Sequence, residues 1–293
     1  MNNIQNNSAQ RTNMKYGVVC TNFNNTHFTE KMMESLSLNT VKPARIVVVD
    51  NNSLPQWVSQ LESLIEFYPT LEPVFNSQNV GYFRGLNDGI RRLFSTDLDL
   101  DFVIIGNNDL EFPVDFGSQL EAYQDEWSAL PVISPAIVTL DGVHQNPHVI
   151  DRISVLRQII WDLYYANYWF SRLISMLAAR TRSFSDRKDE MQHDTAQFIH
   201  QGYGACYILT RSFFENFGEL WAPSIMFGEE FFLSEQLAGR GFRTYYDPRI
   251  TVTHHCKGSV ASVASRTRWE LARDAHRVYR RFVTPWGLAK APK

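Results

Sequence analysis

Short apolar runs alternate with amphipathic segments through the first half of the chain. Runs rich in β-branched residues, which predict strands, occupy residues 16–20, 45–50, 102–105 and 131–138, with a weaker run at 71–75. Helical periodicity between these runs predicts helices at 28–38, 55–68 and 84–94. Because the strand runs are apolar throughout, both of their faces are expected to be covered. The pattern therefore predicts an α/β fold with a mostly parallel sheet flanked by helices.

The second half has a different pattern. Residues 152–179 are apolar and aromatic and predict a helical insertion spanning about 150–196. A strand-like stretch at 198–209, a helix from Arg211, a helix at 228–241 and two short strands before residue 255 follow. The last helix is expected at 266–283, where one apolar face comprises Leu271, Ala275, Val278 and Phe282. Three parts result: a polar, disordered tail (1–13), one domain (14–260), and a basic helix and tail (261–293).

Composition excludes several classes of protein. With 293 residues, 44% hydrophobic and 20% charged, the chain is globular and long enough for a large core. Its net charge of -3 argues against nucleic acid as a partner. Three widely separated cysteines favour neither a disulfide framework nor a structural zinc site and fit a reducing compartment. No signal-peptide pattern or spanning apolar run is recognisable, so we expect a cytoplasmic protein.

The charge is distributed unevenly along the chain. Residues 1–150 carry 8 basic and 17 acidic residues, a net charge of -9. Residues 266–293 carry 8 basic and 2 acidic residues, and 151–265 are balanced. The basic C-terminal helix, together with the aromatic segment 152–179, could meet an anionic membrane at the inner face of the cell membrane. A partner subunit, such as a second copy in a homodimer, explains the same features equally well.

Polar residues follow three of the predicted strands. They are Thr21, Asn22 and Asn24 after the first, Asp50 and Asn52 after the second, and Asn107, Asn108 and Asp109 after the fourth. Ligands of open parallel sheets bind beyond the carboxyl ends of the strands, so these side chains are candidates for a binding site. Asp109 beside amides suits a divalent cation that bridges to phosphates. Ordinary turn formation remains the alternative for each cluster.

Three further features carry candidate chemistry. Residues 79–89 hold glycines beside Arg84, which could meet a diphosphate, but they lack the dinucleotide fingerprint, so a nicotinamide-dependent enzyme is disfavoured. Glu229 and Glu230 open a helix, where a carboxylate could accept a proton or simply compensate the helix dipole. His254 ends a strand and is either a metal ligand or a structural histidine.

Taken in order, six motifs resemble those of the family-2 glycosyltransferases, which have the GT-A fold. The motifs are VVCTNFN (18–24), IVVVDNNS (46–53), NVGYFRGLNDG (79–89), IIGNND (104–109), GEEFFLSEQLAGRGF (228–242) and DPRITVTHH (247–255). They cover roughly residues 16–260. The resemblance implies a Rossmann-like sheet, and it is strongest to bacterial enzymes of surface polysaccharide synthesis, including rhamnosyltransferase-like members.

The resemblance also assigns roles by position. It places the nucleoside near Thr21, Asn22, Asn24, Asp50 and Asn52, and the diphosphate and sugar near Asn79, Gly81, Arg84 and Asn87. Asn107-Asn108-Asp109 occupies the place of the family's Asp-x-Asp motif, so Asp109, with His254 nearby, is the expected ligand of Mg²⁺ or Mn²⁺. Glu230 falls on the position of the catalytic base. Two departures matter: Asn107 replaces an Asp, and the base is Glu rather than Asp, which keeps Glu229 open as the working group.

The implied reaction is an inverting transfer of a sugar from a nucleotide-diphosphate donor to a saccharide acceptor. A lipid-linked acceptor would fit synthesis of O-antigen, capsule or another bacterial surface polysaccharide. A sugar nucleotidyltransferase is one alternative, although the loop TNFNNTHF (21–28) lacks the glycine and basic residues that such an enzyme usually has there. A non-catalytic carbohydrate-binding relative is the other.

Overall fold

The computed structural model describes residues 14–95, 98–151, 153–180, 192–256, 265–284 and 287–288. The predicted disordered tail, 1–13, lies outside the described residues. So do most of the polar stretch that ends the predicted insertion and parts of the predicted C-terminal tail.

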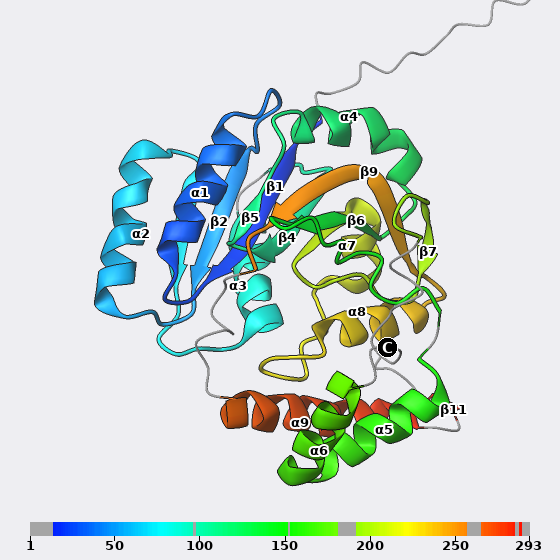
Figure 1. Ribbon diagram of the computed structural model, residues 1–293. Coiled ribbons are helices and arrows are strands. Elements are labelled where there is room, and N and C mark those ends of the chain that lie inside the picture. Colours follow the sequence, from blue (N-terminus) through cyan, green and yellow to red (C-terminus); the bar gives the residue numbers. More distant parts are fainter. Residues whose placement is uncertain are drawn as a thin grey trace, which may run out of the picture.

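Among the described residues, one nine-stranded sheet forms the centre of the molecule (Figure 1). Its parallel half comprises β3 (Leu71–Phe75), β2 (Arg45–Asp50), β1 (Tyr16–Asn22) and β4 (Phe102–Asn107), in that spatial order. The sheet continues through β8 (Cys206–Thr210), which is antiparallel to both neighbours, and then β6 (Val132–Thr139) and β9 (Thr244–His254). Two short strands, β5 (Leu110–Glu111) and β7 (Gln197–Ile199), pair antiparallel with β9. The predicted mostly parallel α/β sheet is confirmed.

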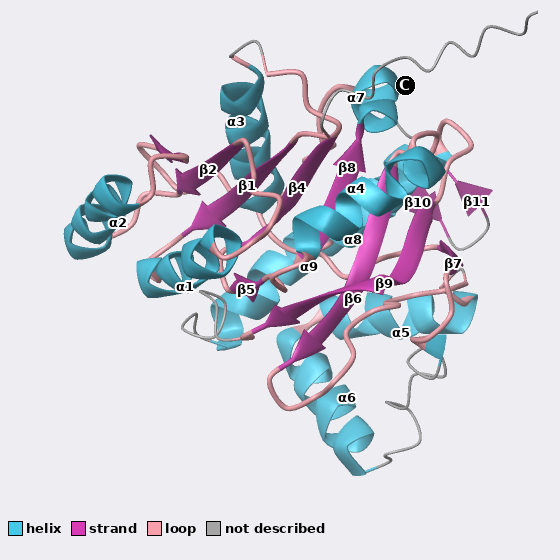
Figure 2. Ribbon diagram, turned by 90° about the horizontal axis from the view of Figure 1, so that it is seen from above, coloured by secondary structure: helices cyan, strands magenta, loops and turns pink. Residues whose placement is uncertain are grey.

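Helices cover both faces of this sheet (Figure 2). On one face lie α1 (Thr26–Ser37), α2 (Pro55–Phe67) and α4 (Phe116–Trp127), and on the other α3 (Tyr82–Phe94), α7 (Arg211–Phe217) and α8 (Glu229–Ala238). Successive residues of β1 point into opposite cores: Val18 belongs to the core cluster that includes Met32 of α1, and Val19 belongs to the cluster that includes Ile90 of α3. The apolar strand runs of the sequence therefore reflect burial on both sides.

Three elements differ from the sequence prediction. The strand-like stretch 198–209 is divided into β7 and β8 by a loop through Gly202 and Gly204. The two short strands expected before residue 255 are one strand, β9, whose ladder with β6 jumps from Asp247 to Thr251. Pro248 lies in this interruption, where it has no ladder hydrogen bond to donate. The helix α4 was not predicted at all.

A further layer of helices lies below the sheet in Figure 1. It consists of α5 (Val155–Ala166), α6 (Tyr168–Arg180) and α9 (Ser265–Phe282), followed by β10 (Val283–Thr284) and β11 (Gly287–Leu288). Apolar side chains on one side of α9 pack on α8, where the ring centroids of Tyr279 and Phe231 are 3.9 Å apart. Asp162 of α5 accepts hydrogen bonds from Arg280 (2.6 Å) and lies 2.7 Å from the ring nitrogen of His276. Side-chain interactions with Asp162 thus hold the basic C-terminal helix, α9, against α5 of the predicted insertion.

None of the described helices is both long enough and apolar enough to cross a membrane.

Candidate active site

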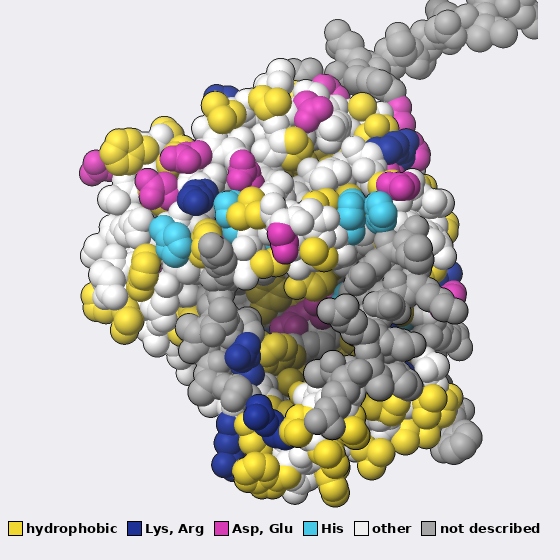
Figure 3. Space-filling view, in the orientation of Figure 1, with side chains coloured by type: hydrophobic (Ala, Val, Ile, Leu, Met, Phe, Trp, Pro, Cys, Tyr) yellow, Lys and Arg dark blue, Asp and Glu magenta, His cyan; other side chains and the backbone are white. Residues whose placement is uncertain are grey.

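The register of the parallel strands brings the predicted polar residues to one edge of the sheet. Asn22 stands opposite Asp50 on β2, and Thr21 stands opposite Asn107 on β4. A cavity of about 380 Å³ lies beyond this edge, between the strand ends and the start of α8. In the space-filling view it appears as a hollow with carboxylate side chains at its bottom (Figure 3). This is the crevice that the sequence pattern predicts for an open parallel sheet.

Asp109 and His254 form one wall of the cavity. The carboxylate oxygen Oδ1 of Asp109 lies 3.1 Å from Nε2 of His254, and both side chains are buried. Among the described residues, Oδ2 of Asp109 has no hydrogen-bond partner. A buried carboxylate oxygen without a partner is costly unless a ligand or an ion completes it.

The orientation of His254 suits a metal ligand. Its Nδ1 lies 2.7 Å from the amide oxygen of Gln145 and can donate a proton to it. In that tautomer Nε2 carries a lone pair, which suits a cation held between Nε2 and Asp109; without a cation, the 3.1 Å contact with the Asp109 carboxylate requires a proton on Nε2. Metal-binding histidines commonly donate their second ring N–H to such an oxygen. Within the described ranges no three His, Cys, Asp or Glu side chains are placed together so that they could hold a metal ion, and the described residues offer Asp109 and His254 as donors here. Two protein donors fit a cation that is completed by substrate phosphates.

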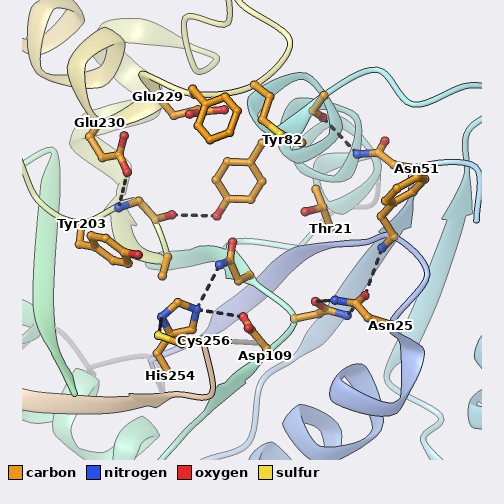
Figure 4. Close-up of a pocket in the computed structure, with 18 of the residues that line it drawn as sticks. Thr21, Asn25, Asn51, Tyr82, Asp109, Tyr203, Glu229, Glu230, His254 and Cys256 are labelled. Atoms are coloured by element: carbon orange, nitrogen blue, oxygen red, sulfur yellow. Dashed lines mark hydrogen bonds and ion pairs between the residues drawn. The ribbon is translucent and has the colours of Figure 1, made fainter. Parts of the chain in front are cut away.

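Glu229 and Glu230 lie on the opposite side of the cavity, at the first turn of α8 (Figure 4). The chain enters this helix through Phe227 and Gly228, which both have positive φ angles (71° and 81°). Such a conformation is unfavourable for Phe227, and strained residues cluster at functional sites. The backbone N–H of Gly204 donates to Oε1 of Glu230 at 3.2 Å, and the Gly204 carbonyl accepts from the hydroxyl of Tyr82 at 2.9 Å. The backbone of Gly204 therefore links Tyr82 of α3 to the Glu230 carboxylate through hydrogen bonds.

The two carboxyl groups differ in their surroundings. Burial, and secondarily the neighbouring charge of Glu230, raises the pKa of Glu229 to about 8. Burial therefore favours the neutral form of Glu229, which cannot accept another proton.

Nine of the predicted site residues line the cavity. They are Thr21, Asn79, Gly81, Asn107, Asn108, Asp109, Glu229, Glu230 and His254. Gly81 has a φ of 96°, and a Cβ atom there would lie 1.9 Å from the carbonyl oxygen of Ile225. Glycine at this position therefore allows the backbone of the loop before α8 to pack directly against the start of α3.

Two predicted residues, Asn22 and Asp50, are buried beneath the cavity rather than in its lining. The Asn22 amide donates to Asp50 at 2.7 Å, and the other Asp50 oxygen accepts from the backbone N–H of Ser53 at 2.8 Å. Asn22 also accepts from the amide of Asn108 at 3.0 Å. This network fixes the ends of β1, β2 and β4 relative to one another.

Four more predicted residues lie outside the cavity lining. Asn24 and Asn52 have positive φ angles of 57° and 66°, as turn-forming asparagines often do. Arg84 donates to the carbonyl of Ala222 at 3.2 Å, and Asn87 exchanges two hydrogen bonds with the backbone of Leu220. Arg84 and Asn87 thus hold the loop before α8 against α3.

The cavity also contains residues that sequence reasoning missed. They are Phe23, Asn25, Asn51, Tyr82, Tyr203, Gly204, Ala205, Met226, Phe227 and Cys256. Asn25, Asn51 and Tyr82 adjoin the predicted clusters, so proximity to a strand end could have identified them. Tyr203 and Gly204 carried no such signal, because their segment was predicted as part of a strand.

Comparison with known proteins decides the family. Residues 18–218 match the model for glycosyl transferase family 2, which is more than half of the chain. The chain belongs to glycosyl transferase family 2. It is a glycosyltransferase with the GT-A fold, as the resemblance implies, and the match favours this assignment over the nucleotidyltransferase and non-catalytic alternatives.

A curated relative lies in the same branch that the motifs resemble. The chain is 23% identical over 238 residues to the N-acetylglucosaminyl-diphospho-decaprenol L-rhamnosyltransferase of Mycobacterium tuberculosis. The aligned region covers 77% of this chain and 71% of the relative. The rhamnosyltransferase-like character is thus supported at the level of sequence similarity.

Solved structures share the fold. The mannosyltransferase PcManGT from Pyrobaculum calidifontis, in complex with GDP-Man and Mn²⁺, matches 90% of this chain with a TM-score of 0.53 and 15% identity. GalNAc-T7 with UDP, GalNAc and Mn²⁺ matches 83% with a TM-score of 0.52 and 16% identity. S. aureus TarS matches 83% with a TM-score of 0.52 and 13% identity. The matches span 64%, 44% and 37% of those longer chains, respectively.

Proposed function

We propose that this protein transfers a sugar, with inversion, from a nucleotide-diphosphate donor to a saccharide acceptor. In this proposal the acceptor is lipid-linked, and the reaction belongs to the synthesis of a bacterial surface polysaccharide such as O-antigen or capsule. One observation carries the proposal: a single cavity has Asp109 and His254 on one wall and Glu230 on the other. Related structures with GDP-Man, UDP-GlcNAc or UDP support a nucleotide-sugar donor. The name of the curated relative supports a lipid-linked acceptor.

The donor diphosphate belongs on the Asp109 side of the cavity. Asp109, through its unpartnered oxygen, and His254, through Nε2, would hold Mg²⁺ or Mn²⁺. When bound, the cation neutralises charge on the departing diphosphate. The Mn²⁺ in two related structures supports this role. Thr21, Asn51 and Asn79 line the adjacent walls and offer hydrogen bonds to the nucleotide and sugar.

Glu230 is the base in this proposal. Burial raises the pKa of Glu229 and so favours its neutral form, and Glu230 falls on the base position that the family motif implies, so we assign the acceptance of the proton to Glu230. The acceptor hydroxyl gives its proton to Glu230 while its oxygen forms a bond to the anomeric carbon. On the opposite side of that carbon the bond to the phosphate oxygen breaks, and its electron pair leaves with the nucleoside diphosphate.

A lipid-linked acceptor requires contact with a membrane, and α5 and α6 provide a surface for it. We name this surface the apolar face. It comprises Val155, Leu156, Ile159, Leu163, Trp169, Phe170, Leu173, Met176 and Leu177, which are 42–76% exposed. Such a large apolar patch marks an interaction site. Arg266 of α9 lies 5.7 Å from the ring of Tyr168 at the start of α6, so cationic groups border the face as anionic lipids require.

We therefore propose peripheral association with the cytoplasmic side of the cell membrane. Apolar side chains gather over α5 and α6 at the lower right of Figure 3, with basic side chains beside them at the lower left. A homodimer that buries the same face is the competing outcome, and measurement of oligomeric state separates the two.

Paired substitutions test the chemical proposal. Glu230→Gln removes the base and should lower kcat about 10²–10⁴-fold, whereas Glu229→Gln preserves a neutral side chain and should lower kcat far less. The assay measures nucleoside diphosphate released from a panel of nucleotide-sugars in the presence of acceptor. Unchanged transfer by Glu230→Gln together with lost transfer by Glu229→Gln would reverse the assignment of the base.

A further inference from the structure

A second cavity adjoins the first on the far side of Glu230. It has a volume of about 170 Å³ and lies between α8, α5 and α9. Phe227 and Glu230 line both cavities, so the Glu230 side chain lies at their junction. The remaining walls come from α5, through Trp161 and Tyr165, and from α9, among other residues.

Among the described residues, the lining of this second cavity is mostly aromatic, includes His148 and His276, and contains no lysine or arginine. Trp161, Tyr165, Phe231 and Tyr279 supply rings, and Ala272 and Ala275 of α9 leave space between them. Aromatic faces pack against the C–H surfaces of neutral ligands, and few polar groups then fix the ligand's orientation. The cavity therefore favours an uncharged ring over a phosphate group.

Gln201 supplies an independent sign of a ligand. Its side chain lines the second cavity and is 5% exposed, and its amide nitrogen Nε2 finds no acceptor among the residues that the structure describes. The backbone of Gln201 is held by hydrogen bonds in both directions with Val149 (2.9 and 3.0 Å). A buried amide donor without a protein partner is rare unless an ordered water or a bound ligand provides the acceptor. A sugar hydroxyl is such an acceptor.

We infer that the second cavity binds the acceptor's terminal sugar ring, the ring that carries the attacking hydroxyl. This inference rests on the proposed function and deepens it. The ring lies among the aromatic side chains, a ring or hydroxyl oxygen accepts from Nε2 of Gln201, and the attacking hydroxyl points through the junction toward Glu230. The proton of this hydroxyl passes to Glu230, its oxygen bonds to the anomeric carbon of the donor, and the nucleoside diphosphate leaves with the electron pair of the broken bond.

Two substitutions test the second cavity. Gln201→Leu keeps a similar shape and removes a buried donor that has no protein partner, so the variant should fold normally. Ala272→Phe places a ring in the cavity from α9. The assay uses a water-soluble, short-chain alkyl diphosphate of N-acetylglucosamine as acceptor, so that membrane contact does not enter. We expect Gln201→Leu to raise the acceptor KM about tenfold and Ala272→Phe to abolish transfer.

Matched controls separate acceptor binding from general damage. Gln197→Leu makes the same change on β7, outside both cavities, and Thr267→Phe adds the same ring at an exposed position of α9. Both controls should transfer as wild type does, and all variants should keep the wild-type dissociation constant for nucleoside diphosphate. Wild-type transfer with an unchanged acceptor KM in Gln201→Leu and Ala272→Phe would overturn the second cavity's assignment alone. Absence of nucleoside diphosphate binding and release in the wild type would overturn the proposed function itself.

Discussion

Glu229 and Glu230 are neighbours in the sequence but differ in what surrounds their carboxyl groups. Glu229 is 8% exposed, and its burial favours the neutral form. Its folded-state pKa of about 8 exceeds the ordinary value of 4.5, so the folded state binds this proton more tightly than the unfolded chain does. The resulting stabilisation is complete below pH 4.5 and is lost as the pH rises through 8.

Glu229→Gln should therefore change the pH dependence of stability. The variant lacks the titrating group, so its melting temperature should fall less than that of the wild type between pH 4.5 and 8. Above pH 8 the variant should be more stable than the wild type, by an amount on the order of a few kcal/mol. Thermal melting across this range measures the effect. Parallel curves for wild type and variant would mean that Glu229 is ionised throughout.

Gly204 is predicted to position the Glu230 carboxylate. A Cβ atom at Gly204 would lie 2.7 Å from Oε1 of Glu230, too close for the present geometry. Gly204→Ala should therefore displace Glu230 and lower kcat about 10²-fold, while leaving the affinity for nucleoside diphosphate within a factor of about two.

A second substitution distinguishes positioning from structural damage. Glu230→Asp shortens the side chain by one methylene, so the double variant Gly204→Ala/Glu230→Asp should recover part of the lost kcat relative to Gly204→Ala. Steady-state kinetics and nucleotide titration measure both quantities. An equal loss of kcat and nucleotide affinity in Gly204→Ala would contradict a positioning role.

Residue-scale prediction from the sequence succeeds where a strand or helix fixes the side chain directly. Asp109 follows β4 and Glu230 lies in the first turn of α8, so their positions in the cavity follow from the fold. Asn22 and Asp50 were expected at the nucleoside, yet they bond to each other beneath the cavity. The sequence does not predict this hydrogen bond, because it depends on how the ends of adjacent strands pair across the sheet. Whether these two residues influence donor binding remains a prediction.

At the scale of elements, α5 and α6 have the most unusual surface. Trp169 is 76% exposed and Leu156 is 65% exposed, although both lie in ordered helices. Replacing both with Ser should weaken binding to anionic liposomes at least tenfold, because each side chain contributes about 1.5–3 kcal/mol when it is buried in lipid. Co-sedimentation at low salt measures the binding.

Phe67 provides the matched control for this surface. It is 74% exposed at the end of α2, on another part of the molecule, so Phe67→Ser should leave liposome binding unchanged. Absence of binding by the wild type at low salt would contradict membrane contact. A wild-type dimer that Trp169→Ser dissociates would instead assign the apolar face to a second copy.

Element boundaries show what local pattern can and cannot predict. The strands β1, β2, β4 and β6 were identified correctly because their sequences are dominated by apolar, largely β-branched residues. The single strand β9 was predicted as two, since Pro248 and Arg249 interrupt its apolar pattern, and only pairing with β6 on both sides of the bulge makes it continuous. The helix α4 was missed, because Phe116 and Leu120 are buried by packing within a polar, acidic stretch.

At the scale of the whole molecule, the charge asymmetry corresponds to two separate regions. The acidic first 150 residues contain β1 to β4, whose edge forms the proposed donor site, and a cation there would offset the local negative charge. The positive charge of 266–293 lies largely on α9, beside the apolar face. The fold thus places the proposed donor-binding edge, the proposed acceptor cavity and the surface proposed for membrane contact in one chain.

Nucleotide binding tests the central claim most directly. Thermal shift is measured with uridine, thymidine, guanosine and cytidine diphosphates, each with and without Mn²⁺, on the wild type and on Asp109→Asn. The account predicts that one nucleotide at 100 times its dissociation constant stabilises the wild type by about 2.7 kcal/mol, and that Asp109→Asn loses the Mn²⁺-dependent part. No stabilisation of the wild type by any of the four nucleotides would contradict a nucleotide-sugar donor in this cavity.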